Sequence, residues 1–208
     1  MTRAYSPYLT TICMCEIICV TNRQLCKEDF LARVEKIAAS KPDAIILREK
    51  DLPEDQYRTL AQSVISICNK YGVMCILHTY VRVAKELNAP IHLPINIVRD
   101  RAHELGGLTY GVSCHSVGDA VEAEHRGASY ITAGHIFDTD CKKGLPGRGT
   151  EFLQNVTEAV KIPVYAIGGI CRENIGEVIK SGAKGACVMS DAMTADNPQS
   201  YIKELRQN

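Results

Sequence analysis

Residues 162–189 read IPVYAIGGICRENIGEVIKSGAKGACVM, and this stretch decides the fold. A short apolar run at 164–167 has the composition of a buried strand, and a paired-glycine turn follows it. Residues 173–181 then show helical periodicity, and a second apolar strand is expected at 185–189. Gly182 lies between the last two segments, where a helix commonly ends in the left-handed conformation that glycine adopts at little cost. The stretch therefore predicts two parallel strands joined by a helix.

The same unit recurs along the whole chain. We expect eight strands, at residues 17–21, 44–48, 73–77, 90–93, 109–113, 129–133, 164–167 and 185–189. We expect eight helices, at residues 27–39, 53–70, 81–87, 98–105, 117–126, 150–160, 173–181 and 198–206. Apolar strands joined through helices indicate a parallel sheet covered on both sides, either open or closed into a barrel. Eight units favour a (β/α)8 TIM barrel, so we predict one compact α/β domain over residues 1–208.

Composition restricts the partners that the protein can have. The chain has 208 residues, of which 46% are hydrophobic and 23% charged, which suits one well-packed core. Its 24 Lys and Arg residues balance 24 Asp and Glu residues, so no overall positive field attracts nucleic acid or an anionic membrane. A net charge near zero favours a homo-oligomer without requiring one. No stretch approaches the ~18–20 apolar residues that span a bilayer.

Ten cysteines are scattered through the chain without a Cys-x-x-Cys pair. Most lie in apolar runs, where a free cysteine packs as a small hydrophobic residue. The apolar run at residues 9–20 contains Glu16 and has no small-residue cleavage site, so we interpret it as a first core strand rather than a targeting segment. We therefore predict mainly reduced core cysteines and a cytoplasmic protein.

The loops after the last two strands are candidates for binding phosphate, as is common in these barrels. Gly168 and Gly169 follow the seventh strand, and Met189 and Ser190 lie at the end of the eighth. Paired glycines let the backbone approach an anion, and amides at the start of a helix direct donors toward it. The alternative for the glycines is a tight strand-to-helix turn with no ligand. We predict that these four residues hold a phosphate.

The longest interruption follows the sixth strand and reads GHIFDTDCKKGLPGRG at residues 134–149. Its length and its glycines indicate a substrate loop, and it matches neither the dinucleotide fingerprint nor a P-loop. His135 could move a proton near neutral pH, although a structural histidine bonded within the loop is the alternative. Lys142 could neutralise a carboxylate or phosphate, or be a solvated surface cation, which is the role that suits Lys143.

Polar residues also end the second and fifth strands. Arg48 and Lys50 could face an anion, or they could form a rim ion pair with Glu49. Ser113 could donate a hydrogen bond to a substrate, and capping of the following helix is its alternative.

The histidines and cysteines show no convincing metal-binding pattern. His78 and His92 end the third and fourth strands without carboxylates at metal-ligand spacing. Cys13, Cys15 and Cys19 have in-strand spacing with no second cluster, which favours core packing. We predict no metal ligands.

Five segments in order together resemble the thiamine phosphate synthase/TenI superfamily: ILREK at 46–50, GVSCHS at 111–116, GHIFDTDCK at 134–142, IPVYAIGG at 162–169 and VMS at 188–190. They lie at successive predicted strand ends, and the match covers nearly the whole chain. The resemblance implies a (β/α)8 barrel whose glycine turn and final strand end bind the phosphate of a thiazole phosphate.

The resemblance also separates two activities. The synthases need Mg²⁺ to hold the diphosphate of a pyrimidine, with an Asn-Asp pair after the third strand and another Asp after the fourth. Here the third strand is followed by His78-Thr79 and the fourth reads HLPIN at 92–96, so both acidic positions are missing. Gly134-His135 stands where a synthase usually has Gly-Pro, and this loop resembles that of the TenI-type thiazole tautomerases. Those enzymes aromatise a carboxythiazole phosphate by moving a proton, without a metal or redox cofactor.

We therefore predict a thiazole tautomerase-like isomerase of thiamine biosynthesis with no cofactor, in which His135 and Lys142 are catalytic. The predicted substrate-binding residues are Arg48, Lys50, Ser113, Thr139, Gly168, Gly169, Met189 and Ser190. The expected partner is a small phosphorylated thiazole, not nucleic acid or a membrane. One alternative is a Mg²⁺-dependent thiamine phosphate synthase, which joins hydroxymethylpyrimidine diphosphate to thiazole phosphate. The other is a non-catalytic sensor of thiazole phosphate or thiamine phosphate.

Overall fold

The chain forms a closed parallel barrel of eight strands in sequence order, described here by a computed structural model for residues 15–142 and 144–207. The strands are β1 (Glu16–Val20), β2 (Ala44–Leu47), β3 (Met74–His78), β4 (Ile91–Pro94), β5 (Tyr110–Cys114), β6 (Tyr130–Gly134), β7 (Val164–Ile167) and β8 (Gly185–Val188). β1 pairs with both β2 and β8, which closes the sheet. The predicted TIM barrel is thus confirmed, and both ends of every predicted strand lie within one residue of their predicted positions.

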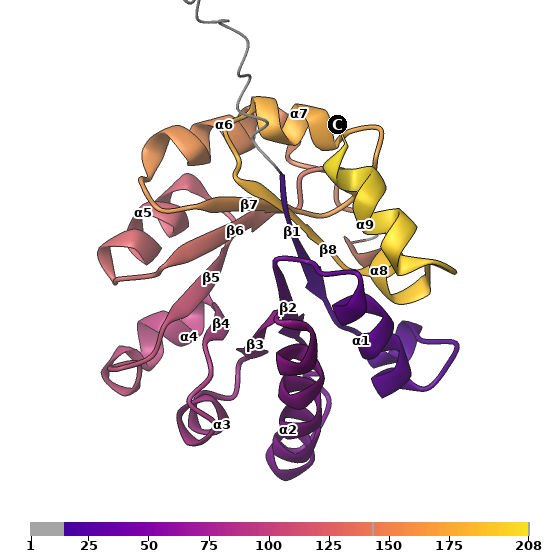
Figure 1. Ribbon diagram of the computed structural model, residues 1–208. Coiled ribbons are helices and arrows are strands. Elements are labelled where there is room, and N and C mark those ends of the chain that lie inside the picture. The colour runs from indigo at the N-terminus through magenta and orange to yellow at the C-terminus, as the bar shows by residue number, and fades with distance from the viewer. Residues whose placement is uncertain (1–14, 143, 208) are drawn as a thin grey trace, which may run out of the picture.

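Helices surround the barrel and cover the outer face of the strands (Figure 1). They are α1 (Phe30–Ala39), α2 (Glu54–Tyr71), α3 (Val81–Glu86), α4 (Ile95–Asp100), α5 (Val117–His125), α6 (Gly149–Ala159), α7 (Ile175–Lys180), α8 (Ser190–Thr194) and α9 (Pro198–Arg206). Three short 3-10 helices are η1 (Arg23–Leu25), η2 (Ala102–Glu104) and η3 (Asp140–Lys142). No helix within the described ranges is long and apolar enough to cross a membrane.

Three helical segments differ from the prediction. The helix expected at 27–39 begins only at Phe30, because the Asp29 side chain caps it by accepting a hydrogen bond from the backbone N–H of Ala32. The helix expected at 98–105 instead begins at Ile95, directly after β4, and a separate 3-10 turn follows it. Ile95 and Val98 are both buried, and their spacing of three residues places them on one helical face. The five residues of α8 were not predicted as a helix separate from α9, because a single turn is too short to show periodicity.

Apolar side chains fill two separate spaces. The larger cluster lies between the strands and the surrounding helices, and a smaller one inside the barrel includes Ile18, Ile46, Ile76 and Tyr165. This division follows from the strand geometry, since successive side chains point to opposite faces.

The structure shows free thiols at Cys15, Cys19, Cys26, Cys68, Cys75, Cys114, Cys171 and Cys187. Six of them are buried, as the core interpretation predicts: Cys15, Cys19, Cys68, Cys75, Cys114 and Cys187. Cys13 and Lys143, on which the sequence also led to predictions, lie outside the described residues, as do residues 9–14 of the first predicted core strand.

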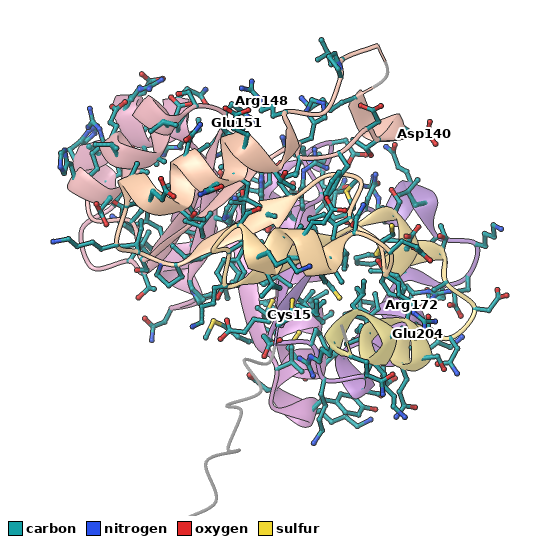
Figure 2. All side chains as sticks on the ribbon, turned by 90° about the horizontal axis from the view of Figure 1, so that it is seen from above. Cys15, Asp140, Arg148, Glu151, Arg172 and Glu204 are labelled. Atoms are coloured by element: carbon teal, nitrogen blue, oxygen red, sulfur yellow. The ribbon has the colours of Figure 1, made fainter. Side chains whose placement is uncertain are left out.

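The two ends of the barrel carry different features. Cys15 lies at the start of β1, and Asp140 lies far from it, on the loop after β6 (Figure 2). Because all strands are parallel, the loops that follow them gather at the end of the barrel where Asp140 lies.

Candidate functional site

A pocket of about 560 Å³ opens among the loops at the carboxyl ends of the strands. Residues from all eight strands or the loops after them line it, as expected for a barrel of this type. The ten residues predicted from the sequence all lie on its wall: Arg48, Lys50, Ser113, His135, Thr139, Lys142, Gly168, Gly169, Met189 and Ser190. The structure therefore brings the predicted residues together in one place, while their individual roles remain predictions.

Three cationic side chains face this pocket. Arg48 and Lys50 reach it from the loop after β2, and Lys142 reaches it from η3. Partial burial, followed by the positive charges of Arg48 and Lys142, lowers the pKa of Lys50. Within the described ranges, none of the three forms an ion pair with a carboxylate. An anion bound between these cations would relieve their mutual repulsion.

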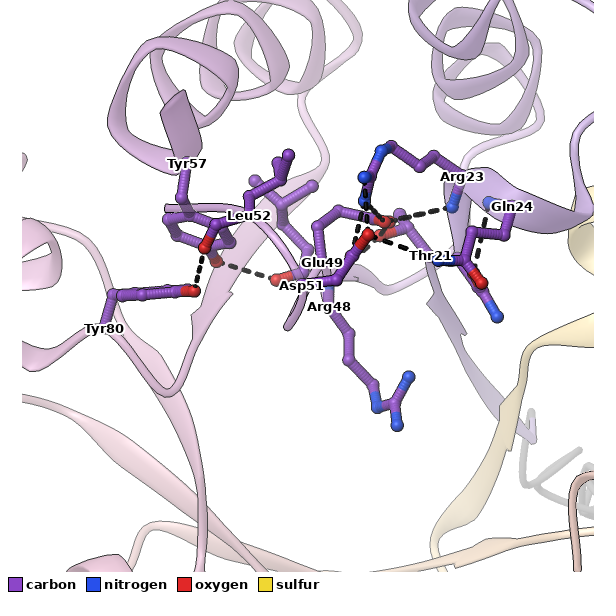
Figure 3. A network of polar contacts seen from close by, with 11 residues as sticks. Thr21, Arg23, Gln24, Arg48, Glu49, Asp51, Leu52, Tyr57 and Tyr80 are labelled. Atoms are coloured by element: carbon purple, nitrogen blue, oxygen red, sulfur yellow. Dashed lines mark hydrogen bonds and ion pairs between the residues drawn. The ribbon is translucent and has the colours of Figure 1, made fainter. Parts of the chain in front are cut away.

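Glu49 does not neutralise these cations. It is only 2% exposed, and it accepts hydrogen bonds from the Thr21 hydroxyl at 2.7 Å and from the backbone N–H of Arg23 at 3.1 Å. The Arg23 guanidinium also lies 3.3 Å from Glu49, whereas the Arg48 side chain points away from this network (Figure 3). The network ties the loop after β2 to the end of β1. The alternative of a rim ion pair between Glu49 and Arg48 or Lys50 is therefore not what the structure shows.

His135 follows β6 directly and lies on the pocket wall. Its Nε2 lies 3.2 Å from the carbonyl oxygen of Leu145 in the same loop. A carbonyl oxygen only accepts hydrogen bonds, so Nε2 is the donor in this contact, and in the neutral tautomer the free lone pair lies on Nδ1. His135 is therefore bonded within its loop and also faces the pocket, and its role in moving a proton stays a prediction.

The two glycines after β7 let this loop pack closely. Both have positive φ, at 101° for Gly168 and 64° for Gly169. A Cβ on Gly168 would lie 2.4 Å from the Cβ of His135, and a Cβ on Gly169 would lie 2.4 Å from the carbonyl oxygen of Asp138. The backbone N–H of Phe137 also donates to the Gly168 carbonyl at 3.0 Å. A tight turn is therefore present, and it also brings the predicted phosphate loop against His135.

The deep wall of the pocket carries two buried histidines, His78 and His92, which are 4% and 3% exposed. His92 Nε2 lies 2.7 Å from Ser113 Oγ, and His92 Nδ1 lies 3.0 Å from the Tyr130 hydroxyl. Burial, helped by the positive charge of Lys50, lowers the pKa of His92 to about 3. Burial, followed by His92, lowers the pKa of His78 well below its usual value. Both rings are therefore neutral at physiological pH.

Ser113 does not cap a helix. The N-terminal cap of α5 is Ser116, whose Oγ accepts a hydrogen bond from the backbone N–H of Asp119 at 3.0 Å. This leaves Ser113 directed to His92 and the pocket.

Acid is expected to destabilise the protein through His78 and His92. In the unfolded chain both should titrate near the usual value of 6.5, whereas both pKa values are depressed in the folded state. Below that pH the unfolded state binds protons that the folded state does not, so the free energy of unfolding falls as the pH falls. For His92 we expect a loss of about 2 kcal/mol between roughly pH 6.5 and pH 5, and His78 should add a loss in the same direction.

Urea denaturation at the two pH values measures this loss. His92→Asn should make the pH dependence shallower, and His103→Asn should leave it unchanged, since His103 is a surface residue with a 79% exposed side chain. Equal stability of the wild type at both pH values would contradict the prediction.

The pocket also contains residues that the sequence analysis missed. His115 is one of them, and its Nδ1 donates a hydrogen bond to the carbonyl oxygen of Gly134 at 2.9 Å. Tyr201 reaches the wall from α9, and its buried hydroxyl has no hydrogen-bond partner in the described part of the chain. No sequence signal pointed to Tyr201, because it lies on a helix and not in a loop after a strand.

Magnesium ligands are not evident among these side chains. The ends of β3 and β4 present His78, His92 and Pro94 to the pocket, and its wall has two carboxylates, Asp140 and Asp191, on other loops. No group of three or more His, Cys, Asp or Glu residues within the described ranges could hold a metal ion. Magnesium prefers carboxylate and water oxygens, so the donors at these two strand ends do not fit it.

The fold and the pocket define a (β/α)8-barrel protein suited to small anionic ligands. The family described as thiamine monophosphate synthase (TMP-TENI) matches residues 17–192, and the chain belongs to this family. The superfamily resemblance found in the sequence is thereby confirmed.

Similar proteins carry the synthase name. A thiamine-phosphate synthase of Pyrococcus horikoshii is 34% identical over 194 residues, covering 90% of this chain and 91% of the relative. Thiamine-phosphate synthase 2 of Streptococcus pneumoniae serotype 4 is 36% identical over 198 residues, covering 89% and 93%. Among solved structures, a thiamine phosphate pyrophosphorylase from Pyrococcus furiosus aligns with a TM-score of 0.80 at 29% identity, covering 95% and 96% of the two chains. These matches do not distinguish the TenI-type proteins from the synthases.

Proposed function

We propose that this protein is an enzyme of thiamine biosynthesis that aromatises carboxythiazole phosphate, and thus a thiazole tautomerase. The observation that carries the proposal is the environment of His135. Its Nε2 is engaged by the Leu145 carbonyl, its Nδ1 is left as a base, and it lies on the wall of a pocket that also contains Arg48, Lys50 and Lys142. A proton transfer next to a bound anion needs this combination of groups.

The charges of the pocket fit such a substrate. A phosphate monoester carries about −1.5 to −2 at neutral pH, and a carboxylate adds one more negative charge. Arg48, Lys50 and Lys142 supply three positive charges without carboxylate partners within the described ranges. The phosphate would lie at Gly168, Gly169, Met189 and Ser190, and the carboxylate near the cations.

The reaction is a proton transfer with no change in oxidation state. Nδ1 of His135 would remove a proton from one ring position of the dihydrothiazole and return it at another position, which leaves the ring aromatic. Lys142 would stabilise the negative charge that develops on the conjugated carboxylate in between. His78 and His92 are neutral, so they add no positive charge that would compete with Lys142 for the anion.

A second candidate is thiamine phosphate synthase, and the names of the relatives favour it. That reaction releases pyrophosphate, whose charge requires a counter-ion. The ends of β3 and β4 present histidines and a proline where carboxylates would hold Mg²⁺, which favours the tautomerase.

Two assays on the purified protein decide between these candidates. In the first, the dihydro carboxythiazole phosphate is incubated with the protein and EDTA, and aromatisation is followed by ultraviolet absorbance. In the second, hydroxymethylpyrimidine diphosphate and thiazole phosphate are supplied with Mg²⁺, and pyrophosphate is measured. We expect turnover only in the first. Pyrophosphate release would establish the synthase instead, and saturable binding with no turnover in either assay would indicate a sensor.

A further inference from the structure

Three residues from three different strands form a hydrogen-bonded chain that ends in the pocket. His92 on β4 bridges Tyr130 on β6 and Ser113 on β5, at 3.0 Å from Nδ1 and 2.7 Å from Nε2 respectively. Ser113 lines the pocket, whereas Tyr130 lies deeper in the barrel. The chain therefore runs from the barrel interior to the ligand space.

The barrel is built to hold Tyr130 beside His92. Gly111 pairs in register with His92, and a Cβ on Gly111 would lie 2.1 Å from the Cζ atom of the Tyr130 ring. The Tyr130 ring also packs edge-on against Tyr165, with ring centroids 5.6 Å apart. Any larger residue at position 111 would displace the phenol, so its position at Nδ1 depends on the backbone of β5.

The proton positions in this hydrogen-bonded chain of side chains follow from the number of donors and acceptors that each side chain offers. His92 is neutral, so one ring nitrogen donates and the other accepts. Burial raises the pKa of Tyr130, so its hydroxyl keeps its proton, and among the described residues its one hydrogen-bond partner is His92 Nδ1. If Nδ1 carried the proton, the O–H of the half-buried Tyr130 would have no acceptor among the described residues, which is costly inside the barrel. The Tyr130 O–H therefore donates to Nδ1, and Nε2–H donates to Ser113 Oγ.

Ser113 is then left with its own proton to donate. The other hydroxyl near it is that of Thr132, at 3.5 Å, which is too long for a strong hydrogen bond. Because its oxygen already accepts from Nε2–H, the Ser113 O–H is free to point at a ligand. Ser113 thus offers a hydrogen-bond donor on the part of the pocket wall that also carries the neutral rings of His78 and His92.

We propose that Tyr130 and His92 are positioning residues that hold Ser113 as a hydrogen-bond donor to an acceptor atom of the bound carboxylated heterocycle. The inference rests on the proposed function for the identity of that ligand, but the hydrogen-bond direction does not depend on it. The opposite imidazole tautomer would make Ser113 donate to His92, and the ligand would then lose its donor.

Nitrogen-15 NMR of the histidine side chains in the unliganded protein tests the chain directly. We expect wild-type His92 to show a protonated Nε2 and an unprotonated Nδ1. Tyr130→Phe removes the donor but keeps the ring, so Nδ1 should lose the shift caused by its hydrogen bond, and the other tautomer should become populated. A protonated Nδ1 in the wild type, or an unchanged His92 spectrum in Tyr130→Phe, would overturn the proposal.

Tyr165→Phe is the matched control. It removes a phenolic hydroxyl from the same barrel, but that hydroxyl donates to Glu16 at 2.5 Å and makes no contact with His92. Its His92 spectrum should match that of the wild type. Ser113→Ala tests the other end, and there the Nε2 signal should shift while Nδ1 stays unprotonated.

Binding of the aromatic carboxythiazole phosphate, measured by calorimetry, gives the functional readout. Loss of one oriented hydrogen bond should weaken binding about 3- to 10-fold in Tyr130→Phe, with little change in Tyr165→Phe. Wild-type affinity in Tyr130→Phe would contradict the positioning role. If the wild-type protein does not bind this ligand at all, the proposed function fails, and the NMR result still decides whether the hydrogen-bonded chain exists.

Discussion

His135→Ala is expected to lower the kcat of thiazole aromatisation about 10²- to 10⁴-fold, the usual range for loss of a positioned acid–base group. The variant removes the one ring nitrogen that the Leu145 carbonyl leaves unprotonated at the pocket wall. The KM should change much less, because the proposed substrate contacts of Arg48, Lys50 and the phosphate loop would remain. Steady-state kinetics on the dihydro carboxythiazole phosphate measure both quantities.

Two further variants make this experiment specific. In His135→Gln the amide nitrogen lies near the place of the imidazole Nε2, so it can still donate to the Leu145 carbonyl, but the side chain has no base. Activity should therefore be lost as in the alanine variant. His103→Ala removes an imidazole from η2, where the side chain is 79% exposed, and should retain wild-type kcat. Full activity of His135→Ala, with circular dichroism showing a folded protein, would mean that another group moves the proton.

Gly168→Ala is expected to reduce both stability and activity. Its positive φ of 101° disfavours any side chain, and the new Cβ would lie 2.4 Å from His135 Cβ and 2.9 Å from His135 Cα. The backbone strain and the forced displacement together should cost about 2–4 kcal/mol. Because the displaced residue is His135 itself, we also expect kcat to fall at least about 10-fold, in line with the effect of small misplacements at reacting groups.

Gly72→Ala separates the effect of backbone strain from the effect of displacing His135. Gly72 has a similar positive φ of 69°, but nothing lies within 4 Å of a Cβ built there, at the end of α2. This variant should lose about 1–2 kcal/mol of stability and keep full activity. Urea denaturation and the aromatisation assay on both variants measure the two effects. A Gly168→Ala protein with wild-type kcat would show that His135 does not depend on the close approach of the two loops.

Much of the fold and most of the site could be predicted from the sequence. Apolar periodicity is a local property, so the strands and most helices were recognisable from short windows such as 162–189. Parallel strands in a closed barrel place all their carboxyl ends on one side. Once eight units were counted, Arg48, Ser113, His135 and Ser190 were expected to meet, and the pocket contains all of them.

The direction of individual hydrogen bonds could not be predicted in the same way. Glu49 stands between Arg48 and Lys50 in the chain, yet it binds Thr21 and Arg23, which lie more than twenty residues away. The periodicity that predicts a strand does not say which distant side chain will be its neighbour in the barrel.

The tertiary structure alone also decides how the ionisable groups behave. His92 is neutral because it is buried against β5 and β6, and its tautomer follows from a phenol that comes 38 residues later in the chain. His135 carries its free lone pair on Nδ1 because a carbonyl ten residues away engages Nε2. The residue types and their order were enough to predict a barrel with an anion-binding mouth. The positions of the protons on His92 and His135 could be assigned only from the tertiary structure. They depend on burial and on hydrogen-bond partners that are distant in the sequence.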